Sequence, residues 1–335
     1  MRIASFNLES LDLPPKARVP LEARAEMLRP QLERLDADVL CLQEVNAQKI
    51  PGTSTRQLVA LDALLAGTRY ANYQRAVSTS GEAGGVTDVH NLVTLSRLPI
   101  VEQRSLLHCY VKPPLHERVT ARPPDAEPTP IRLDRPLLLT EIALADGRRL
   151  AVINVHLRAP LATAIPGQKE APFVWKSVAG WAEGYYTASV KRALQALELR
   201  LAVDALLDEA PQRLVLVAGD LNAEDHETPL RLVIGAEEDT GNGRLAARAL
   251  VLLDRAIPED RRFSIVHYGR PQMFDHMLAS RALLAHVQGI EVHNETLGDE
   301  ALAYAKVAVA PGSYHAPLVL TLNLDGAGAV GATTA

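Results

Sequence analysis

Apolar runs of strand length recur along the chain, and most of them stop at a polar residue. Residues 214–218 form such a run, which ends at Gly219 and is followed by Asp220 and Asn222. A short apolar run bounded by glycine is typical of a buried strand. In an extended segment, Asp220 and Asn222 project to the same side, and Gly219 lets the backbone approach a ligand closely. We therefore expect function at the end of this strand.

The same pattern predicts further strands and the helices between them. Strands are predicted at residues 2–6, 39–42, 91–96, 137–145, 149–156, 274–279 and 317–322. Apolar residues at helical spacing predict helices at residues 21–35, 57–65 and 187–207. Strands come in pairs separated by helices, without an early series of simple βαβ units. We therefore expect an α/β protein in which two mixed sheets pack together with helices outside. An open parallel sheet is the alternative.

Two insertions interrupt this pattern. Six prolines lie between residues 113 and 130, which predicts a long surface loop without regular structure near 112–135. Residues 159–186 form the second insertion, and their aromatic side chains are Phe173, Trp175, Trp181, Tyr185 and Tyr186. This segment directly follows His156, so we expect it to border the site and to help choose the substrate. The alternative is that its rings pack the insertion onto the body.

Length, charge and cysteine content limit the function classes. We expect one domain over residues 1–324 and a flexible tail over 325–335. The net charge of −5 gives no general attraction for nucleic acid, so long duplex DNA is disfavoured as a partner. Cys41 and Cys109 are too few for a disulfide framework, and no apolar stretch approaches transmembrane length. We expect a cytoplasmic monomer.

Polar residues that adjoin the apolar runs supply the candidate chemistry. They are Asn7, Glu44, His156, Asp220, Asn222, Asp275 and His315. Each alone has an ordinary explanation as a turn former, a loop acid or a cap, but seven in one chain indicate a site. Carboxylate and amide oxygens suit a hard cation such as Mg²⁺, and a histidine paired with an aspartate is favoured in its charged form. This set indicates cleavage of a phosphoester by positioning and charge stabilisation.

Other hydrolase classes lack their motifs here. The sequence has no H-E-x-x-H segment and no paired-cysteine spacing, which disfavours a zinc hydrolase. It also has no G-x-S-x-G segment, which disfavours a serine hydrolase.

Several short motifs resemble one superfamily in their order along the chain. They are F-N at 6–7, L-Q-E-V at 42–45, L-S-R-L-P-I at 95–100, N-V-H-L at 154–157, G-D-L-N at 219–222, F-D-H-M-L-A-S at 274–280 and S-Y-H-A-P-L at 313–318. Together they resemble the endonuclease/exonuclease/phosphatase superfamily, whose fold is similar to that of DNase I. The resemblance spans residues 1–324. It implies a four-layer α/β (α+β) sandwich and a phosphoesterase that uses Mg²⁺ or Mn²⁺ and an activated water.

The resemblance also implies roles for single residues. Glu44 would bind the metal with help from Asn7, which would also contact the phosphate. Asp220 and Asn222 would orient the attacking water and the phosphate. The substrate would be a phosphodiester or a phosphomonoester, as in a nuclease or a phosphatase, and these motifs do not choose among nucleic acids, lipid headgroups and inositol phosphates.

The two histidines would complete the site. Asp275 would orient His315, which would contact the scissile phosphate as base or electrostatic stabiliser. His156 would face the phosphate from the other side as a candidate general acid, and the sequence leaves the division of acid and base between the histidines open.

Tyr314 departs from the superfamily pattern, which usually has aspartate just before the last histidine. A tyrosine offers the substrate only a phenolic oxygen, so we expect weaker binding of a single metal ion. The alternative is that Tyr314 points into the core and a neighbouring acid compensates. The departure also keeps open a catalytically inactive binding module with the same fold.

Overall fold

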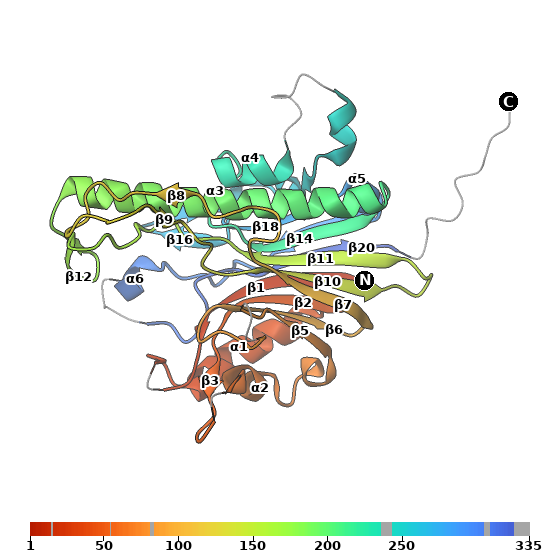
Figure 1. The fold of residues 1–335 in the computed structure, drawn as a ribbon. Helices are drawn as coiled ribbons and strands as arrows, with labels where there is room; N and C mark the ends of the chain where they lie inside the picture. Colours follow the sequence, from red (N-terminus) through yellow and green to blue (C-terminus); the bar gives the residue numbers. More distant parts are fainter. Residues whose placement is uncertain (15, 54, 81–83, 236–242, 305–308, 325–335) are drawn as a thin grey trace.

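A computed structural model describes residues 1–14, 16–53, 55–80, 84–235, 243–304 and 309–324 (Figure 1). The tail predicted at 325–335 lies outside these residues. The described residues form two six-stranded sheets. In spatial order, the first sheet consists of β19 (Val287–Val292), β20 (Leu318–Leu322), β1 (Arg2–Leu11), β2 (Val39–Val45), β6 (Asn91–Ser96) and β5 (Gln74–Val77). The second consists of β15 (Val251–Leu252), β18 (Asp275–Ala279), β14 (Leu214–Asp220), β11 (Arg149–His156), β10 (Leu137–Ala143) and β7 (Ile100–Leu106).

Both sheets are mixed. β1 and β2 run parallel in the first sheet, as do β11 and β14 in the second, and their other neighbours pair antiparallel. The prediction of two mixed sheets is therefore confirmed, and the alternative of one open parallel sheet is wrong.

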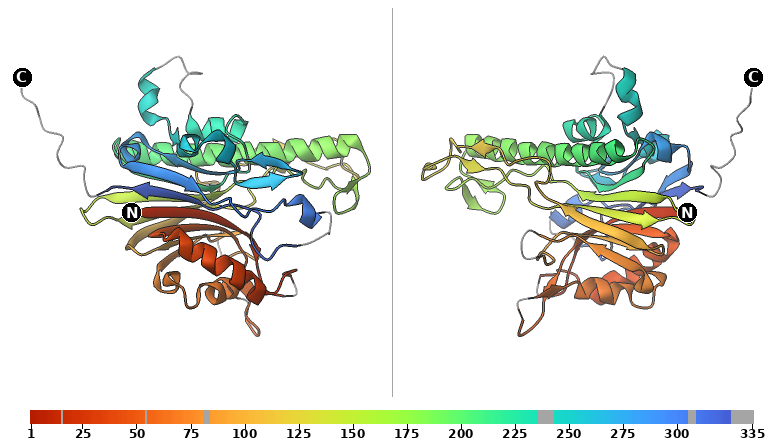
Figure 2. Two further views of the ribbon diagram at one scale, coloured as in Figure 1. Left: turned by 180° about the vertical axis from the view of Figure 1, so that it is seen from behind. Right: turned by 45° about the vertical axis from the view of Figure 1, so that its right-hand side comes forward.

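Helices cover the outer face of each sheet, which gives four layers (Figures 1 and 2). The apolar cluster outside the first sheet is formed with α1 (Leu21–Leu35) and α2 (Val59–Leu65). The cluster outside the second sheet is formed with α3 (Val178–Glu209) and α4 (Thr228–Ile234). A third apolar cluster fills the space between the sheets.

The alternation of side chains along the strands produces these layers. In β14, Val215 and Val217 belong to the cluster under α3, whereas Leu216 and Ala218 belong to the cluster between the sheets. Asp220 continues the second series, so its carboxylate lies on the face between the sheets. The central strands are apolar on both faces because both faces are buried.

Shorter elements fill the connections. The small strands are β3 (Gln48–Lys49), β4 (Arg56–Gln57), β8 (Leu115–His116), β9 (Thr129–Pro130), β12 (Lys169–Ala171), β13 (Val174–Trp175), β16 (Ile265–His267) and β17 (Arg270–Gln272). The short helices are α5 (Arg281–Leu284) and α6 (Ala301–Tyr304), with 3-10 turns η1 (Arg69–Asn72), η4 (Gly243–Arg248), η5 (Leu253–Ala256) and η6 (Glu259–Arg261). None of the described helices combines the length and the apolar character needed to cross a bilayer.

The insertions are more regular than predicted. The proline-rich segment contains the small hairpin β8–β9, so the expectation of no regular structure there is wrong. Helix α3 begins at Val178 rather than at residue 187, because Ser177 caps it by accepting a hydrogen bond from the backbone N–H of Gly180. Trp181, Tyr185 and Tyr186 are therefore helix residues, and only the hairpin β12–β13 precedes them.

Candidate active site

Strand register places three of the predicted residues side by side. His156 on β11 is the register partner of Asp220 on β14, which is in turn the partner of Asp275 on β18. Asn7, on β1 of the other sheet, faces them and donates from Nδ2 to Asp220 Oδ2 at 3.0 Å. These four side chains form a centre where the two sheets meet.

Glu44 reaches this centre through an irregularity in β2. Simple alternation would place Glu44 on the helix-covered face with Leu40 and Leu42, which belong to the outer cluster. Its φ of 57° lies in the left-handed region, and the pairing of β2 with β6 shifts register between Leu42 and Val45. The resulting kink turns the carboxylate of Glu44 to 3.4 Å from Asn7 Nδ2.

Two expectations for the G-D-L-N segment are wrong. Gly219 does not make room for a ligand: a Cβ there would lie 2.0 Å from the carbonyl oxygen of Val155, so glycine allows β14 to approach β11. Asn222 is not extended, because its φ is 49°. Its backbone N–H donates to Asp220 Oδ1 at 2.8 Å, and its side-chain Nδ2 donates to the Leu157 carbonyl at 3.0 Å. The backbone N–H of Asn222 therefore fixes the Asp220 carboxylate, while the Asn222 side chain is bonded to the backbone of Leu157.

His315 and Asp275 form the expected pair. His315 Nδ1 lies 2.7 Å from Asp275 Oδ2, and its Nε2 lies 4.0 Å from Asp220 Oδ2. Burial alone would lower the pKa of His315, but the charge and hydrogen bond of Asp275, helped by Asp220, raise it well above its usual value. Burial, and then the charge of Asp275, raise the pKa of Asp220. These contacts favour the charged form of His315.

The pKa of His156 is shifted in the opposite direction. Its Nε2 lies 3.6 Å from Glu44 Oε1 and 3.5 Å from Asp220 Oδ2, and Arg135 places Nη1 2.8 Å from the same nitrogen. Burial, and then the charge of Arg135, hold the pKa of His156 well below its usual value. A neutral His156 is a proton acceptor or a metal ligand near pH 7.

The sequence analysis missed His90 and Arg135. His90 immediately precedes β6, and Arg135 lies two residues before β10. Both strands run antiparallel to a neighbour that ends at the centre, namely β2 and β11. The start of such a strand lies at the same edge as the end of its neighbour. The rule that selected Asp275 at a strand start would also have selected these two residues.

Glu9 is a further carboxylate that was missed, and it lies beside Tyr314. The ring of Tyr314 is buried, with 4% exposed, and its phenolic oxygen accepts a hydrogen bond from Ala310 N–H rather than from a residue of the centre. The backbone N–H of Tyr314 donates to Glu9 Oε2 at 2.8 Å. Burial raises the pKa of Glu9, and the charge of His315 opposes that rise. This arrangement favours the alternative in which Tyr314 points away and a neighbouring acid compensates.

Arg24 holds Glu9 in place. Its guanidinium donates to the carbonyl oxygens of Leu8, Glu9 and Pro311 at 2.6, 2.8 and 3.2 Å. These bonds tie the end of β1 to the loop that carries Tyr314.

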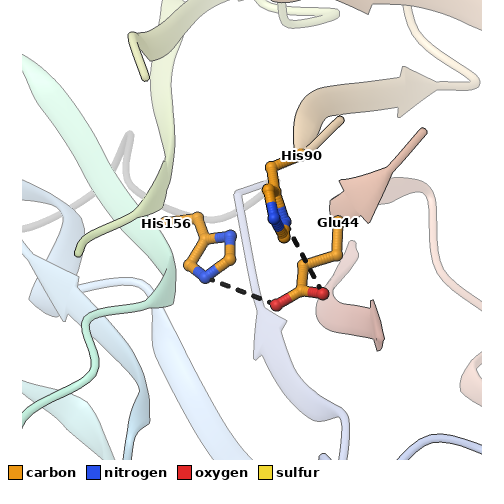
Figure 3. A group of neighbouring side chains, drawn as sticks. All are labelled: Glu44, His90 and His156. Carbon is orange, nitrogen blue, oxygen red and sulfur yellow. Dashed lines mark ion pairs between the residues drawn. The ribbon is translucent and has the colours of Figure 1, made fainter. Parts of the chain in front are cut away.

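Two groups among the described residues could hold a metal ion, because their ligand atoms lie within 4.8 Å of one another. One group is Asp220, Asp275 and His315, and the other is Glu44, His90 and His156 (Figure 3). Asp275 Oδ1 is buried without a hydrogen-bond partner in the described part of the chain. Divalent cations are typically bound by adjacent carboxylates, and an oxygen without a hydrogen bond is free to act as a ligand.

Comparisons with known proteins agree with this fold. A model described as Endonuclease/Exonuclease/phosphatase family matches residues 4–315. The chain is similar to the solved structure of a mannosyl-6-phosphatase from Bacteroides thetaiotaomicron, at 15% identity and a TM-score of 0.58 over 96% of this chain and 99% of that one. No curated protein sequence matches the chain.

Two further structures are similar over nearly their whole length. An endonuclease/exonuclease/phosphatase from Bacteroides vulgatus matches at 14% identity and a TM-score of 0.55, covering 97% of this chain and 98% of that one. D. rerio TDP2, solved with a single-strand DNA product, matches at 17% identity and a TM-score of 0.51, covering 96% and 98%. At these identities the likeness shows the fold alone.

Proposed function

Because the chain belongs to the endonuclease/exonuclease/phosphatase family, we propose that it is a divalent-metal-dependent phosphoesterase that acts through an attacking water. Members of the family are phosphoester hydrolases that generally use divalent metals. One observation supports the proposal most: the register of three strands of one sheet gathers His156, Asp220 and Asp275 opposite Asn7 of the other sheet. Structural residues alone would not explain this concentration of buried acids and histidines.

The donor set fits a divalent cation. Glu44 would hold the ion, and the carboxylates of Asp220 and Glu9 would add negative charge nearby. Asn7 Nδ2 contacts both Glu44 and Asp220, so it sets their separation instead of turning its oxygen to them. A bound cation would supply positive charge opposite the phosphate oxygens.

The remaining residues have separable roles in hydrolysis. Asp220, held by the backbone N–H of Asn222, is placed to accept a proton from the attacking water, whose oxygen bonds to phosphorus as the ester P–O bond breaks. His315, kept charged by Asp275, is placed to donate to a phosphate oxygen. Arg135 offers a second cation to the developing charge. The neutral His156 is better suited to accept than to donate a proton.

A panel of simple esters tests this proposal. Bis(p-nitrophenyl) phosphate and p-nitrophenyl phosphate, each with Mg²⁺ or Mn²⁺ and with EDTA, report phosphodiesterase and phosphomonoesterase activity separately. Glu44→Gln, Asp220→Asn and His315→Ala should each lower kcat by about 10²–10³ while circular dichroism stays native. Glu102→Gln, on the exposed edge strand β7, is the control and should keep full activity. Full activity in excess EDTA would contradict metal dependence, and no turnover under any condition would favour the inactive binding module.

The substrate class is the next question. The similar proteins include a mannosyl-6-phosphatase and a TDP2 structure with single-strand DNA, so we propose testing sugar phosphates and single-stranded DNA first. Duplex DNA serves as the comparison, since the net charge disfavours it.

A further inference from the structure

One buried nitrogen at the centre has no hydrogen-bond partner among the described residues. His90 Nδ1 is buried and makes no hydrogen bond to any described residue, although it lies 3.7 Å from Glu44 Oε2 (Figure 3). That distance is too long for a hydrogen bond. The φ of His90 is 58°, so a left-handed backbone aims this ring. A buried, unsatisfied nitrogen aimed at a carboxylate requires an explanation.

A second imidazole lies on the other side of the same carboxylate. His156 Nε2 is 3.6 Å from Glu44 Oε1, and the two rings have centroids 5.7 Å apart at an interplanar angle of 76°. Figure 3 shows both rings turned toward the carboxylate, one to each oxygen. Ligand atoms of a single bound ion lie roughly 3 Å apart, since metal–nitrogen distances are about 2.1 Å. Small side-chain movements would therefore bring all three residues onto one ion.

We propose that Glu44, His90 and His156 form a mixed nitrogen–oxygen site that selects a first-row transition dication over Mg²⁺. Mg²⁺ prefers oxygen ligands and water, whereas two imidazoles and one carboxylate are a typical set for transition dications with open positions. Asn7 points its Nδ2 at Glu44, so the amide adds no oxygen to this group. The inference rests on the metal dependence proposed above, but it concerns which ion is bound and by which histidine.

The charged neighbours of the site are compatible with this assignment. Arg135 Nη1 lies 2.5 Å from His156 Nδ1 and 2.8 Å from His156 Nε2. Coordination through Nε2 leaves the ring proton on Nδ1, so the guanidinium has to move away from both nitrogens. Asp220 Oδ2 lies 3.5 Å from His156 Nε2 and provides an acceptor for the displaced guanidinium. Ser10 donates to Glu44 Oε2 from its backbone N–H at 2.9 Å, which fixes the carboxylate between the two rings.

Metal binding without any ester tests the proposal. The whole protein, stripped with EDTA and dialysed, is titrated with Co²⁺ and followed by visible absorption, and with Mn²⁺ and Mg²⁺ by calorimetry. We expect ligand-field bands of nitrogen-bound Co²⁺ and an affinity for Co²⁺ and Mn²⁺ at least tenfold above that for Mg²⁺. His90→Gln should weaken Co²⁺ and Mn²⁺ binding at least tenfold, shift the Co²⁺ bands and leave Mg²⁺ affinity within about twofold.

His226→Gln is the matched control, because His226 is an exposed histidine outside the centre, with Nδ1 3.9 Å from Asp225 Oδ1. It should leave all three affinities and the spectrum unchanged. The proposal is overturned if His90→Gln binds Co²⁺ as the parent does, or if it weakens Mg²⁺ equally. A protein that binds Co²⁺ through His90 but cleaves no phosphoester would overturn the proposed function and leave this inference standing.

Discussion

Left-handed backbone conformations decide where key side chains of the centre point. Glu9, Glu44, His90 and Asn222 have φ values of 48°, 57°, 58° and 49°. For residues with a side chain this conformation is unfavourable by roughly 1–2 kcal/mol each, and such outliers concentrate at functional sites. The order of motifs along the chain identifies Glu44 as a candidate, but alternation along β2 would turn it toward the helices. The direction of these side chains could therefore not be predicted from sequence pattern.

Substitutions of Glu9 and Tyr314 can decide whether Glu9 compensates for the aspartate that usually precedes the last histidine, or whether Tyr314 limits the metal site. Since Glu9 lies beside the position that an aspartate usually occupies, we expect Glu9→Gln to weaken divalent-metal binding by about tenfold. Tyr314→Phe removes only the hydroxyl bonded to Ala310 and should leave metal affinity unchanged. Calorimetric titration with Mn²⁺ measures both. A large gain in affinity from Tyr314→Asp alone would instead show that Tyr314 limits the metal site.

His276 should make stability depend on pH. Both ring nitrogens face acceptors, with Nδ1 3.1 Å from Asp254 Oδ2 and Nε2 2.8 Å from the Ala223 carbonyl, so the buried ring suits the charged form. Burial alone would lower the pKa of His276, but Asp254 and these bonds raise it. The folded pKa is therefore above the unfolded value of about 6.5, and the stabilisation present below that pH is lost as pH rises through the folded pKa.

Urea unfolding between pH 6 and pH 9 measures this effect. Wild type should lose about 1.4 kcal/mol for each unit by which the pKa is raised. His276→Gln should show a flatter profile over the same range. His315 contributes equally to both proteins, so subtracting one free energy of unfolding from the other leaves the contribution of His276. Equal slopes would mean that His276 is neutral in the folded protein.

At the scale of elements, the hairpin β12–β13 and the first turns of α3 form one packed unit. A Cβ on Gly184 would lie 2.8 Å from the Trp175 ring, and a Cβ on Gly180 would lie 2.5 Å from Gln168, so these glycines let the hairpin approach the helix. Phe173, at the hairpin tip, is 74% exposed. It lines a cavity of about 410 Å³, which Glu9 also lines. Trp175 thus packs the insertion onto α3, and Phe173 borders the cavity that Glu9 also lines.

Single substitutions should separate these two roles. Phe173→Ala should raise KM several-fold and leave the thermal midpoint within about 1 °C, because the ring is exposed beside the centre. Trp175→Ala should lower the midpoint by several degrees with little change in KM, since it removes packing on α3. Activity on the responsive ester and thermal unfolding give both values. Unchanged KM in Phe173→Ala would mean that the cavity does not hold substrate.

The elements differ in how far sequence could predict them. Central strands such as β14 and β11 are buried on both faces, so their apolar runs are clear. β5, β7 and β19 were not predicted, and each is an edge strand of its sheet with at least half of its residues exposed. An edge strand needs little apolar sequence, because its partner supplies the hydrogen bonds and solvent covers its side chains. The start of α3 was missed because Gly180 and Gly184 lower helix propensity, while tertiary packing requires them.

At the scale of the whole molecule, the centre depends on how the two sheets are joined. Asn154 on β11 accepts from Gln43 Nε2 at 2.8 Å and donates to the carbonyls of Leu42 and Val93 at 3.2 and 3.1 Å. These bonds connect the two sheets through Gln43, which precedes Glu44 in β2, and Asn154, which lies two residues before His156 in β11. The position of the two residues relative to each other therefore depends on a buried polar contact between layers.

Asn154→Leu should reveal this dependence. It leaves buried polar groups unsatisfied, so we expect a loss of about 3 kcal/mol in the free energy of unfolding and weaker metal binding. Thr140→Val is the matched control, because the hydroxyl of Thr140 is buried without a hydrogen-bond partner in the described residues, and its removal should not destabilise. Urea unfolding and Mn²⁺ titration measure both effects. A stable Asn154→Leu with normal metal affinity would show that apolar packing alone aligns the sheets.

Cys41 lies in the apolar layer between the sheets, and its pKa is raised by burial to about 12. Cys109 is exposed. A thiol reagent should therefore modify the protein in two phases: Cys109 within the mixing time, and Cys41 only when the sandwich opens. The slow phase reports the frequency of that opening in the native protein, without denaturant or an introduced label. A metal held by residues of both sheets binds only the closed form. Saturating metal should therefore slow the modification of Cys41 by a factor that grows with the metal concentration divided by the dissociation constant. The modification of Cys109 should keep its rate.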